Sequence, residues 1–100
     1  MRVISRKHLI ACWERHPDIE QSLKAWYDEA SKARWLTPQD IKAQYKSASF
    51  VGRNRVVFNI KGNHYRLVVA VAYRFGAIYV KFVGTHGEYD KIDAATVEME

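Results

Sequence analysis

The chain has 100 residues, of which 48% are hydrophobic and 13% aromatic, and a formal net charge of +5, so we expect one globular domain over residues 1–100. No apolar run approaches the roughly 18 residues of a membrane-spanning helix, and charges interrupt the start of the chain before a signal peptide forms. We therefore expect a cytoplasmic protein without a membrane segment. The lone Cys12 excludes an internal disulfide and a zinc site built on thiolates.

The first part of the chain predicts a short strand followed by two to three helices. "RVIS" is typical of a strand, and Ser5 is placed to cap a helix that ends at His16-Pro17. "TPQD" begins a later, short helix, with Thr37 as its N-cap and Asp40 as its capping-box acid. Between them, one apolar stripe recurs at helical spacing and consists of Ile19, Leu23, Trp26, Tyr27 and Ala30.

From residue 54 the apolar period changes to 2, which is typical of strands. "RVVFNI" is followed by "KGN", a hairpin turn in which Gly62 and Asn63 tolerate positive φ. The next strand sends one face inward, namely Tyr65, Leu67, Val69, Val71, Tyr73 and Phe75. After "FGA", the strand "IYVKFV" sends Phe82 inward with Ile78 and Val80, and sends Val83 outward with Tyr79 and Lys81.

Together these patterns predict an α+β fold. The expected sheet is small and antiparallel, with about four strands: a C-terminal three-strand meander joined by the first strand. Two to three N-terminal helices pack on its apolar face.

Basic residues are concentrated in the middle of the chain. Residues 41–87 hold eight Lys or Arg and no acid, whereas residues 88–100 hold five acids and one Lys. A basic segment of this kind favours a partner that carries phosphate.

A candidate site follows from the strand alternation. Arg55, Arg66 and Lys81 should point away from the helices, which would place cations from three neighbouring strands on one exposed sheet face. His86 and Tyr89 lie in "GTHGEYD", which we expect to be a loop at the end of the last strand, beside this face. Further cations for an RNA backbone are Arg53, Arg55, Lys61, His64 and Arg74.

This combination of side chains suits RNA cleavage. RNA is cut without a metal when one group deprotonates the ribose 2′-OH, another protonates the leaving 5′-oxygen, and cations stabilise the phosphorus between them. His86 can transfer either proton, Tyr89 can orient the nucleophile or donate to the leaving oxygen, and Arg66 and Lys81 can hold the phosphate. The scattered histidines predict no metal site, and we expect no cofactor.

Two other functional classes stay open. The basic face also suits a non-catalytic RNA- or ribosome-binding module, or an interaction protein that receives an acidic partner segment. His86 also suits a surface or turn-capping role, and Tyr89 suits an anchor for the C-terminal residues. Only a nuclease requires both side chains for chemistry.

Two stretches, "NRVVFNIKGNHYRLVVAV" and "IYVKFVGTHGEYDKID", resemble the HigB-type toxins of bacterial toxin–antitoxin pairs, which belong to the RelE-like group of small ribonucleases. The motifs are Gly62-Asn63-x-x-Arg66-Leu67 and Thr85-His86-x-Glu88-Tyr89-Asp90. The resemblance implies an mRNA interferase, an endonuclease that cuts mRNA on the translating ribosome, inhibits translation and arrests growth. It implies neutralisation by a helix-turn-helix antitoxin of the HigA type. It also implies catalytic residues at His86 and Tyr89 and phosphate contacts at Arg66 and Lys81.

Overall fold

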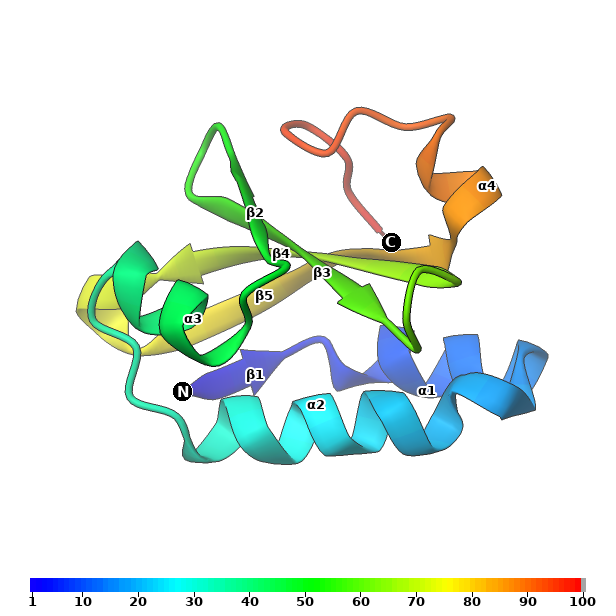
Figure 1. The fold of residues 1–100 in the computed structure, drawn as a ribbon, viewed down its shortest axis with the longest axis horizontal. Coiled ribbons are helices and arrows are strands. Elements are labelled where there is room, and N and C mark those ends of the chain that lie inside the picture. The colour runs from blue at the N-terminus through cyan, green and yellow to red at the C-terminus, as the bar shows by residue number, and fades with distance from the viewer. Residues whose placement is uncertain (100) are drawn as a thin grey trace.

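The computed structural model describes residues 1–99, and Figure 1 shows a helical layer beneath a twisted sheet. The elements in chain order are β1 (Arg2–Ile4), α1 (Arg6–Arg15), a 3₁₀ turn (Pro17–Ile19), α2 (Glu20–Lys32), α3 (Pro38–Gln44), β2 (Ser49–Val51), β3 (Arg55–Ile60), β4 (Tyr65–Ala72), a second 3₁₀ turn (Tyr73–Phe75), β5 (Ala77–Thr85) and α4 (His86–Tyr89). None of the helices in the described part of the chain is long and apolar enough to cross a membrane.

The helices begin and end near the predicted residues. α1 stops at His16, because Pro17 cannot continue it and instead opens the 3₁₀ turn. At α3, the Thr37 hydroxyl accepts a hydrogen bond from the Asp40 amide, and the Asp40 carboxylate accepts one from the Thr37 amide at 3.1 Å. The predicted capping box is therefore confirmed. Ser5 does occupy the N-cap position of α1, but its side chain makes no capping hydrogen bond.

The sheet has five strands in the order β1-β5-β4-β3-β2, which confirms the fold class and adds one strand. β1 pairs with β5 in parallel, and the other neighbours are antiparallel. We expected about four strands because β2 spans only Ser49–Val51, and three residues are too few to show an alternation in the sequence. As predicted, the first strand joins the C-terminal meander.

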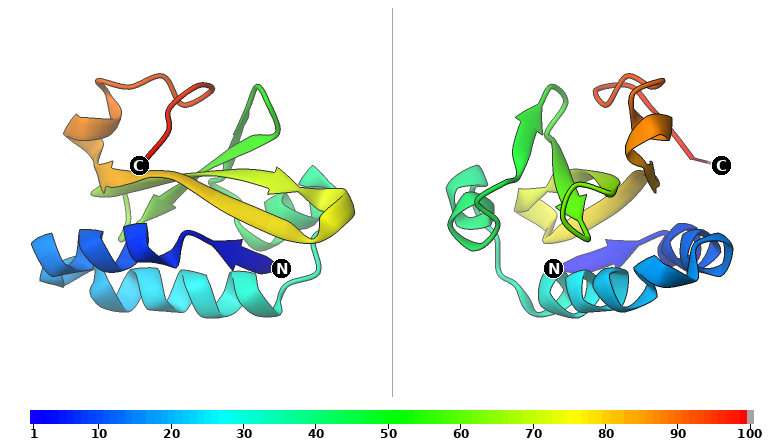
Figure 2. Two further views of the ribbon diagram at one scale, coloured as in Figure 1. Left: turned by 180° about the vertical axis from the view of Figure 1, so that it is seen from behind. Right: turned by 45° about the vertical axis from the view of Figure 1, so that its right-hand side comes forward.

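The core lies between the inner face of the sheet and the helices α1 and α2, which cover that face in both views of Figure 2. Trp26 of α2 contacts Phe58 of β3 edge to face, with ring centroids 5.5 Å apart. The inner face is lined by Val56, Phe58, Ile60, Tyr65, Leu67, Val69, Val71, Ile78, Val80 and Val83. Most of this set was predicted from the alternation alone.

One prediction for β5 is wrong. Val68 of β4 pairs with Phe82, but the next residue, Val69, pairs with Val80, so Lys81 is an extra residue in β5. Such a β-bulge shifts the alternation by one position beyond it. Val83 is consequently buried in the core, and Phe82 pairs with a residue of the outer face, which reverses our expectation for both side chains.

Two predicted turns differ in detail. β4 ends at Ala72, and Phe75, expected to point inward, is 78% exposed in the 3₁₀ turn that leads to Gly76. Gly76 adopts positive φ (63°), which ends the turn and starts β5. In the β3–β4 turn, positive φ is adopted by Lys61 (53°) and Gly62 (64°) rather than by Asn63.

Beyond α4, residues 90–99 turn back across the outer face of the sheet, the face opposite the helices (Figures 1 and 2). We call residues 90–99 the C-terminal segment. It covers part of the surface that the sequence suggested would be open.

Candidate active site

The "GTHGEYD" stretch forms a short helix where we expected a loop. Thr85 is the N-cap of α4: its amide donates to Glu88 Oε1 at 2.8 Å, and its hydroxyl accepts from the Glu88 amide at 3.1 Å. The hydrogen bond from the Thr85 amide is the main cause of a lowered pKa of the Glu88 carboxyl. The His86 amide donates to the His64 carbonyl at 3.0 Å, which ties α4 to the β3–β4 turn.

His86 is exposed and held by a carboxylate. Its Nδ1 lies 3.1 Å from Asp90 Oδ2, one helical turn further on, and 51% of its side chain is open to solvent. A carboxylate at this distance favours the tautomer with its proton on Nδ1. Nε2 is then left with a lone pair that can accept a proton.

Tyr89 lies between the outer sheet face and a cation. Its ring is 6.4 Å from the ring of Phe82, centroid to centroid, and the Arg66 guanidinium carbon is 5.9 Å from the Tyr89 ring centroid. Arg66 also donates to the Asn63 carbonyl at 3.0 Å, which holds its side chain near the β3–β4 turn. The Tyr89 ring thus lies beside Phe82 of β5 and Arg66 of β4, while its expected role as an anchor for the C-terminal residues stays a prediction.

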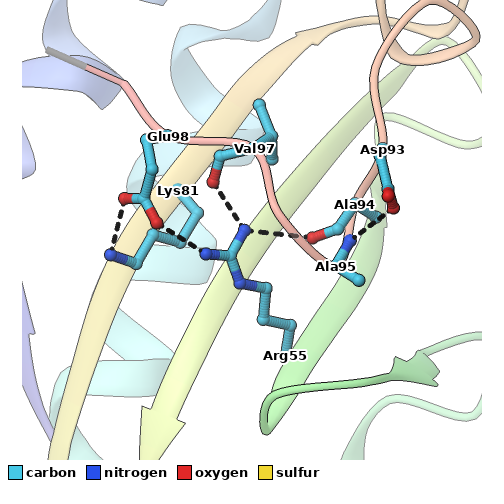
Figure 3. Close-up of polar contacts among 7 residues, drawn as sticks. All are labelled: Arg55, Lys81, Asp93, Ala94, Ala95, Val97 and Glu98. Atoms are coloured by element: carbon cyan, nitrogen blue, oxygen red, sulfur yellow. Dashed lines mark hydrogen bonds and ion pairs between the residues drawn. The ribbon is translucent and has the colours of Figure 1, made fainter.

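Arg55 and Lys81 lie on the same sheet face but are not free (Figure 3). Arg55 is only 4% exposed, because the C-terminal segment covers it. Its guanidinium donates to the carbonyls of Ala94 (3.1 Å) and Val97 (2.5 Å) and to Glu98 Oε2 (2.7 Å), as Figure 3 shows. Our expectation that Arg55 is exposed is therefore wrong.

Glu98 joins the two cations through its two oxygens. Oε1 accepts from Lys81 Nζ at 2.8 Å, while Oε2 is bound to Arg55. These contacts, first with Lys81 and then with Arg55, lower the pKa of the Glu98 carboxyl. The Glu98 side chain itself is 59% exposed.

The other predicted cations fall into two groups. His64 is exposed in the β3–β4 turn beside α4, whereas Lys61 of the same turn is bound at 3.0 Å to Asp18, which follows α1 on the helical side. Arg53 and Arg74 flank the opposite ends of β3 and β4, so the six residues of β3 and the eight residues of β4 separate them from the turn. At roughly 3.3 Å per residue, that is too far to reach a phosphate at His86.

Three residues near the candidate site were not predicted: Phe82, Asp90 and Glu98. The bulge in β5 reversed the direction that the alternation predicted for the Phe82 side chain. Asp90 comes close to His86 only because the chain between them is helical. Glu98 had a visible signal, because the five acids after residue 87 follow a segment with eight cations and no acid. Opposite charges in consecutive segments favour a fold-back contact.

Within residues 1–99, no group of three or more His, Cys, Asp or Glu side chains is placed to hold a metal ion. A surface hollow of about 260 Å³ lies elsewhere, between α3 and β2, and is lined by Pro38, Gln39, Lys42 and Phe50. It contains no residue of the candidate site.

Comparison with known proteins identifies the family. Residues 19–92 match the HigB toxin family model, described as the RelE-like toxic component of a toxin–antitoxin system. The mRNA interferase toxin HigB of Escherichia coli (strain K12) is 30% identical over 93 residues, covering 90% of this chain and 88% of that protein. The mRNA interferase HigB of Escherichia coli O6:H1 is 24% identical over 94 residues, covering 92% of this chain and 91% of that protein. This chain belongs to the HigB family of RelE-like toxins.

Proposed function

We propose that this toxin is an mRNA interferase, a metal-independent endoribonuclease that cuts messages on the translating ribosome. The observation that carries the proposal is His86, exposed at the end of β5 and held by Asp90 at 3.1 Å, with Tyr89 and Arg66 beside it. Two of its relatives carry the name mRNA interferase, which supports the same activity.

In the proposed reaction, His86 Nε2 takes the proton of the ribose 2′-OH at the scissile position. The 2′-oxygen then forms a bond to phosphorus, and the bond from phosphorus to the 5′-oxygen breaks. The leaving oxygen receives a proton from Tyr89 or from the protonated His86, and the products are a 2′,3′-cyclic phosphate and a 5′-OH. The neutral Nδ1-H tautomer favoured by Asp90 suits the first of these steps.

Arg66 and Lys81 would stabilise the charge that develops on the phosphate. Arg66 can offer two parallel N–H donors to phosphate oxygens, and Lys81 supplies a point charge from the adjacent strand. Tyr89 would orient the reacting ribose or donate to the leaving oxygen. His64, in the turn tied to α4, would contact the adjoining RNA backbone.

The central experiment is cleavage of a message bound to purified ribosomes, mapped by primer extension. His86→Ala should cut about 10²- to 10⁴-fold more slowly, because it removes a proton-transfer group, and should keep its affinity for the ribosome. Asp90→Asn should lose less, because it removes only the group that orients His86. Cleavage of a message with a 2′-deoxy sugar at the scissile position would contradict the mechanism.

Tyr89 has a matched control elsewhere in the chain. Tyr27 of α2 is also half-buried with a guanidinium over its ring, that of Arg6 at 4.8 Å. If the Tyr89 hydroxyl takes part in the chemistry, Tyr89→Phe should slow cleavage and Tyr27→Phe should not. Equal cleavage rates for the two variants would show that the Tyr89 hydroxyl takes no part in the chemistry and that the side chain only packs.

The cation roles have a separate readout. Replacing Arg66 with Gln should flatten the slope of log affinity against log salt by about 0.7 for single-stranded RNA, the loss expected for one phosphate contact. Tight, salt-dependent binding of RNA or ribosomes without any cleavage would indicate a non-catalytic binding module instead of a nuclease.

Membership of this toxin family implies an antitoxin partner. We propose a helix-turn-helix antitoxin whose acidic residues or helix mask the basic sheet face. Its gene should restore the growth of cells that express this chain. Growth that stays arrested when the two proteins are produced together would argue against this pairing.

A further inference from the structure

The outer sheet face holds a formed anion site that is filled by the protein itself. Arg55 and Lys81 come from β3 and β5, on either side of β4, and they converge on one carboxylate, that of Glu98 (Figure 3). A carboxylate held by a guanidinium and an ammonium has the donors that a phosphate group also uses.

The C-terminal segment satisfies this site incompletely. Arg55 Nε is buried and has no hydrogen-bond partner among residues 1–99, although both terminal nitrogens of the guanidinium are bonded. One carboxylate charge also faces two cations, so a positive charge is left over at the site. A ligand with more oxygens or more negative charge would satisfy Arg55 and Lys81 better than Glu98 does.

The hold on Glu98 is also exchangeable. Its side chain is 59% exposed, so salt screens its pair with the partly exposed Lys81, whereas its pair with Arg55 has a buried guanidinium. The other contacts to Arg55 are two backbone carbonyls, which release without any change of charge. Release of the segment would also detach Met99, which packs against the core, so displacement has an apolar cost that the ligand must offset.

The anion site adjoins the candidate active site. Lys81 is followed directly by Phe82, whose ring contacts Tyr89, and Tyr89 in turn lies beside Arg66. RNA held at His86 would thus run onto the sheet face now covered by the C-terminal segment. A single-stranded chain has a phosphate at every nucleotide, which suits cations spread along such a face.

We propose that Arg55 and Lys81 form a phosphate subsite for RNA, and that Glu98 occupies it as an internal competitor that RNA displaces. The proposal rests on the proposed ribonuclease function, in which Lys81 already contacts the phosphate, and adds to it Arg55 as a further RNA contact and Glu98 as a built-in restraint. In this scheme the observed affinity for RNA equals the affinity of the open site multiplied by the fraction of molecules in which the segment has left it.

The test measures the affinity of a fully 2′-O-methylated, fluorescently labelled oligoribonucleotide, which lacks the nucleophile and cannot be cut. Glu98→Gln should bind it about 3- to 10-fold more tightly than the wild-type chain, the range expected if surface ion pairs hold the segment closed in most molecules. The matched control is Glu20→Gln, because Glu20 is an exposed carboxylate paired with a lysine, Lys24, on α2 at the helical side. It changes net charge equally, so the difference between the two variants isolates the site.

A second variant ends the chain at Asp93 and so removes every contact to Arg55. It should match or exceed the gain of Glu98→Gln. If the shortened chain binds RNA more weakly than wild type, the segment builds the site rather than blocking it, and the proposal is wrong. An affinity for Glu98→Gln equal to that of Glu20→Gln overturns it as well.

The outcomes separate this inference from the ribonuclease function. Cleavage of ribosome-bound message by the wild-type chain, together with no gain for Glu98→Gln, removes the inference and leaves the function. A gain for Glu98→Gln with no cleavage by any variant supports the phosphate subsite and removes the nuclease. A gain in affinity for the antitoxin alone, with unchanged RNA affinity, assigns the site to an acidic protein segment and overturns the RNA subsite.

Discussion

Gly84 lies in β5, two residues before the start of α4, and replacing it with Ala should destabilise this helix. Gly84 is buried in β5, and a Cβ built there would lie 2.7 Å from Glu88 Oε1 and 2.9 Å from Phe82 Cζ. Glu88 Oε1 is the atom that accepts the Thr85 amide, so the added methyl group would push the carboxylate out of the capping box. The ring of Phe82 would have to move as well.

The size of the effect follows from these two contacts. Loss of the capping-box contact costs about 1 kcal/mol, and moving the end of the partly buried Phe82 ring costs about 1 kcal/mol more. A gain of about 0.5 kcal/mol opposes them, because Ala restricts the unfolded chain. Gly84→Ala should therefore lower the free energy of unfolding by about 1–2 kcal/mol.

Urea unfolding followed by tryptophan fluorescence measures this loss, with Gly52→Ala as the control. Gly52 has no atom within 4 Å of its built Cβ and no positive φ, so its substitution should be neutral or slightly stabilising. In a Glu88→Ala background, Gly84→Ala should cost less, because the carboxylate is already gone. An equal cost in both backgrounds, or a Gly84→Ala curve that matches Gly52→Ala, would refute the clash with Glu88.

Three further predictions concern the scaffold. Phe58→Ala removes a ring that packs against three aromatic side chains and should lower the free energy of unfolding by about 3–5 kcal/mol in urea; a loss below 1 kcal/mol would show that the core closes around the gap. Thr37→Ala removes the hydroxyl of the α3 capping box and should cost about 1 kcal/mol by the same assay. Hydrogen bonds from Lys61 and then Tyr65 lower the pKa of Asp18, so its contribution to stability is present above the unfolded value of 3.8 and is lost as pH falls through the lower folded value. The stability difference between wild type and Asp18→Asn should therefore be constant near neutral pH and shrink below about pH 4, and a difference that does not change with pH would contradict this role.

The alternation of apolar residues predicted most of the sheet because its inner face packs against the helices and forms the core (Figure 2). The prediction failed at Lys81, where both Phe82 and Val83 are apolar and either one satisfies the pattern. A bulge is set by how β4 and β5 pair across the sheet, and this pairing leaves little trace in the sequence of one strand.

Burial of the outer face could not be predicted from strand pattern alone. Alternation says that Arg55 points away from the core, but not whether another segment covers it. That cover comes from Glu98 and its neighbours, 43 positions later in the chain. The charge distribution hinted at such a contact, whereas its register and its acceptors, two of them backbone carbonyls, depend on the folded chain.

The sequence predicted that His86 and Tyr89 follow the last strand, and they do, but the helix α4 that holds them was not foreseen. Thr85 and Glu88 have the spacing of a capping box, and reading them that way would have indicated a helix and placed Asp90 one turn after His86. The roles of His86, Tyr89, Arg66 and Lys81 stay predictions until cleavage is measured.

The parallel pairing of β1 with β5 sets the order in which this toxin can be completed during synthesis. β1 leaves the ribosome first and its partner strand last, so the N-terminal strand has no neighbour in the sheet until residues 77–79 are made. Contacts of such long sequence separation form late and slowly. The sheet, and with it the core between the sheet and the helices α1 and α2, is therefore completed only after β5 has been made.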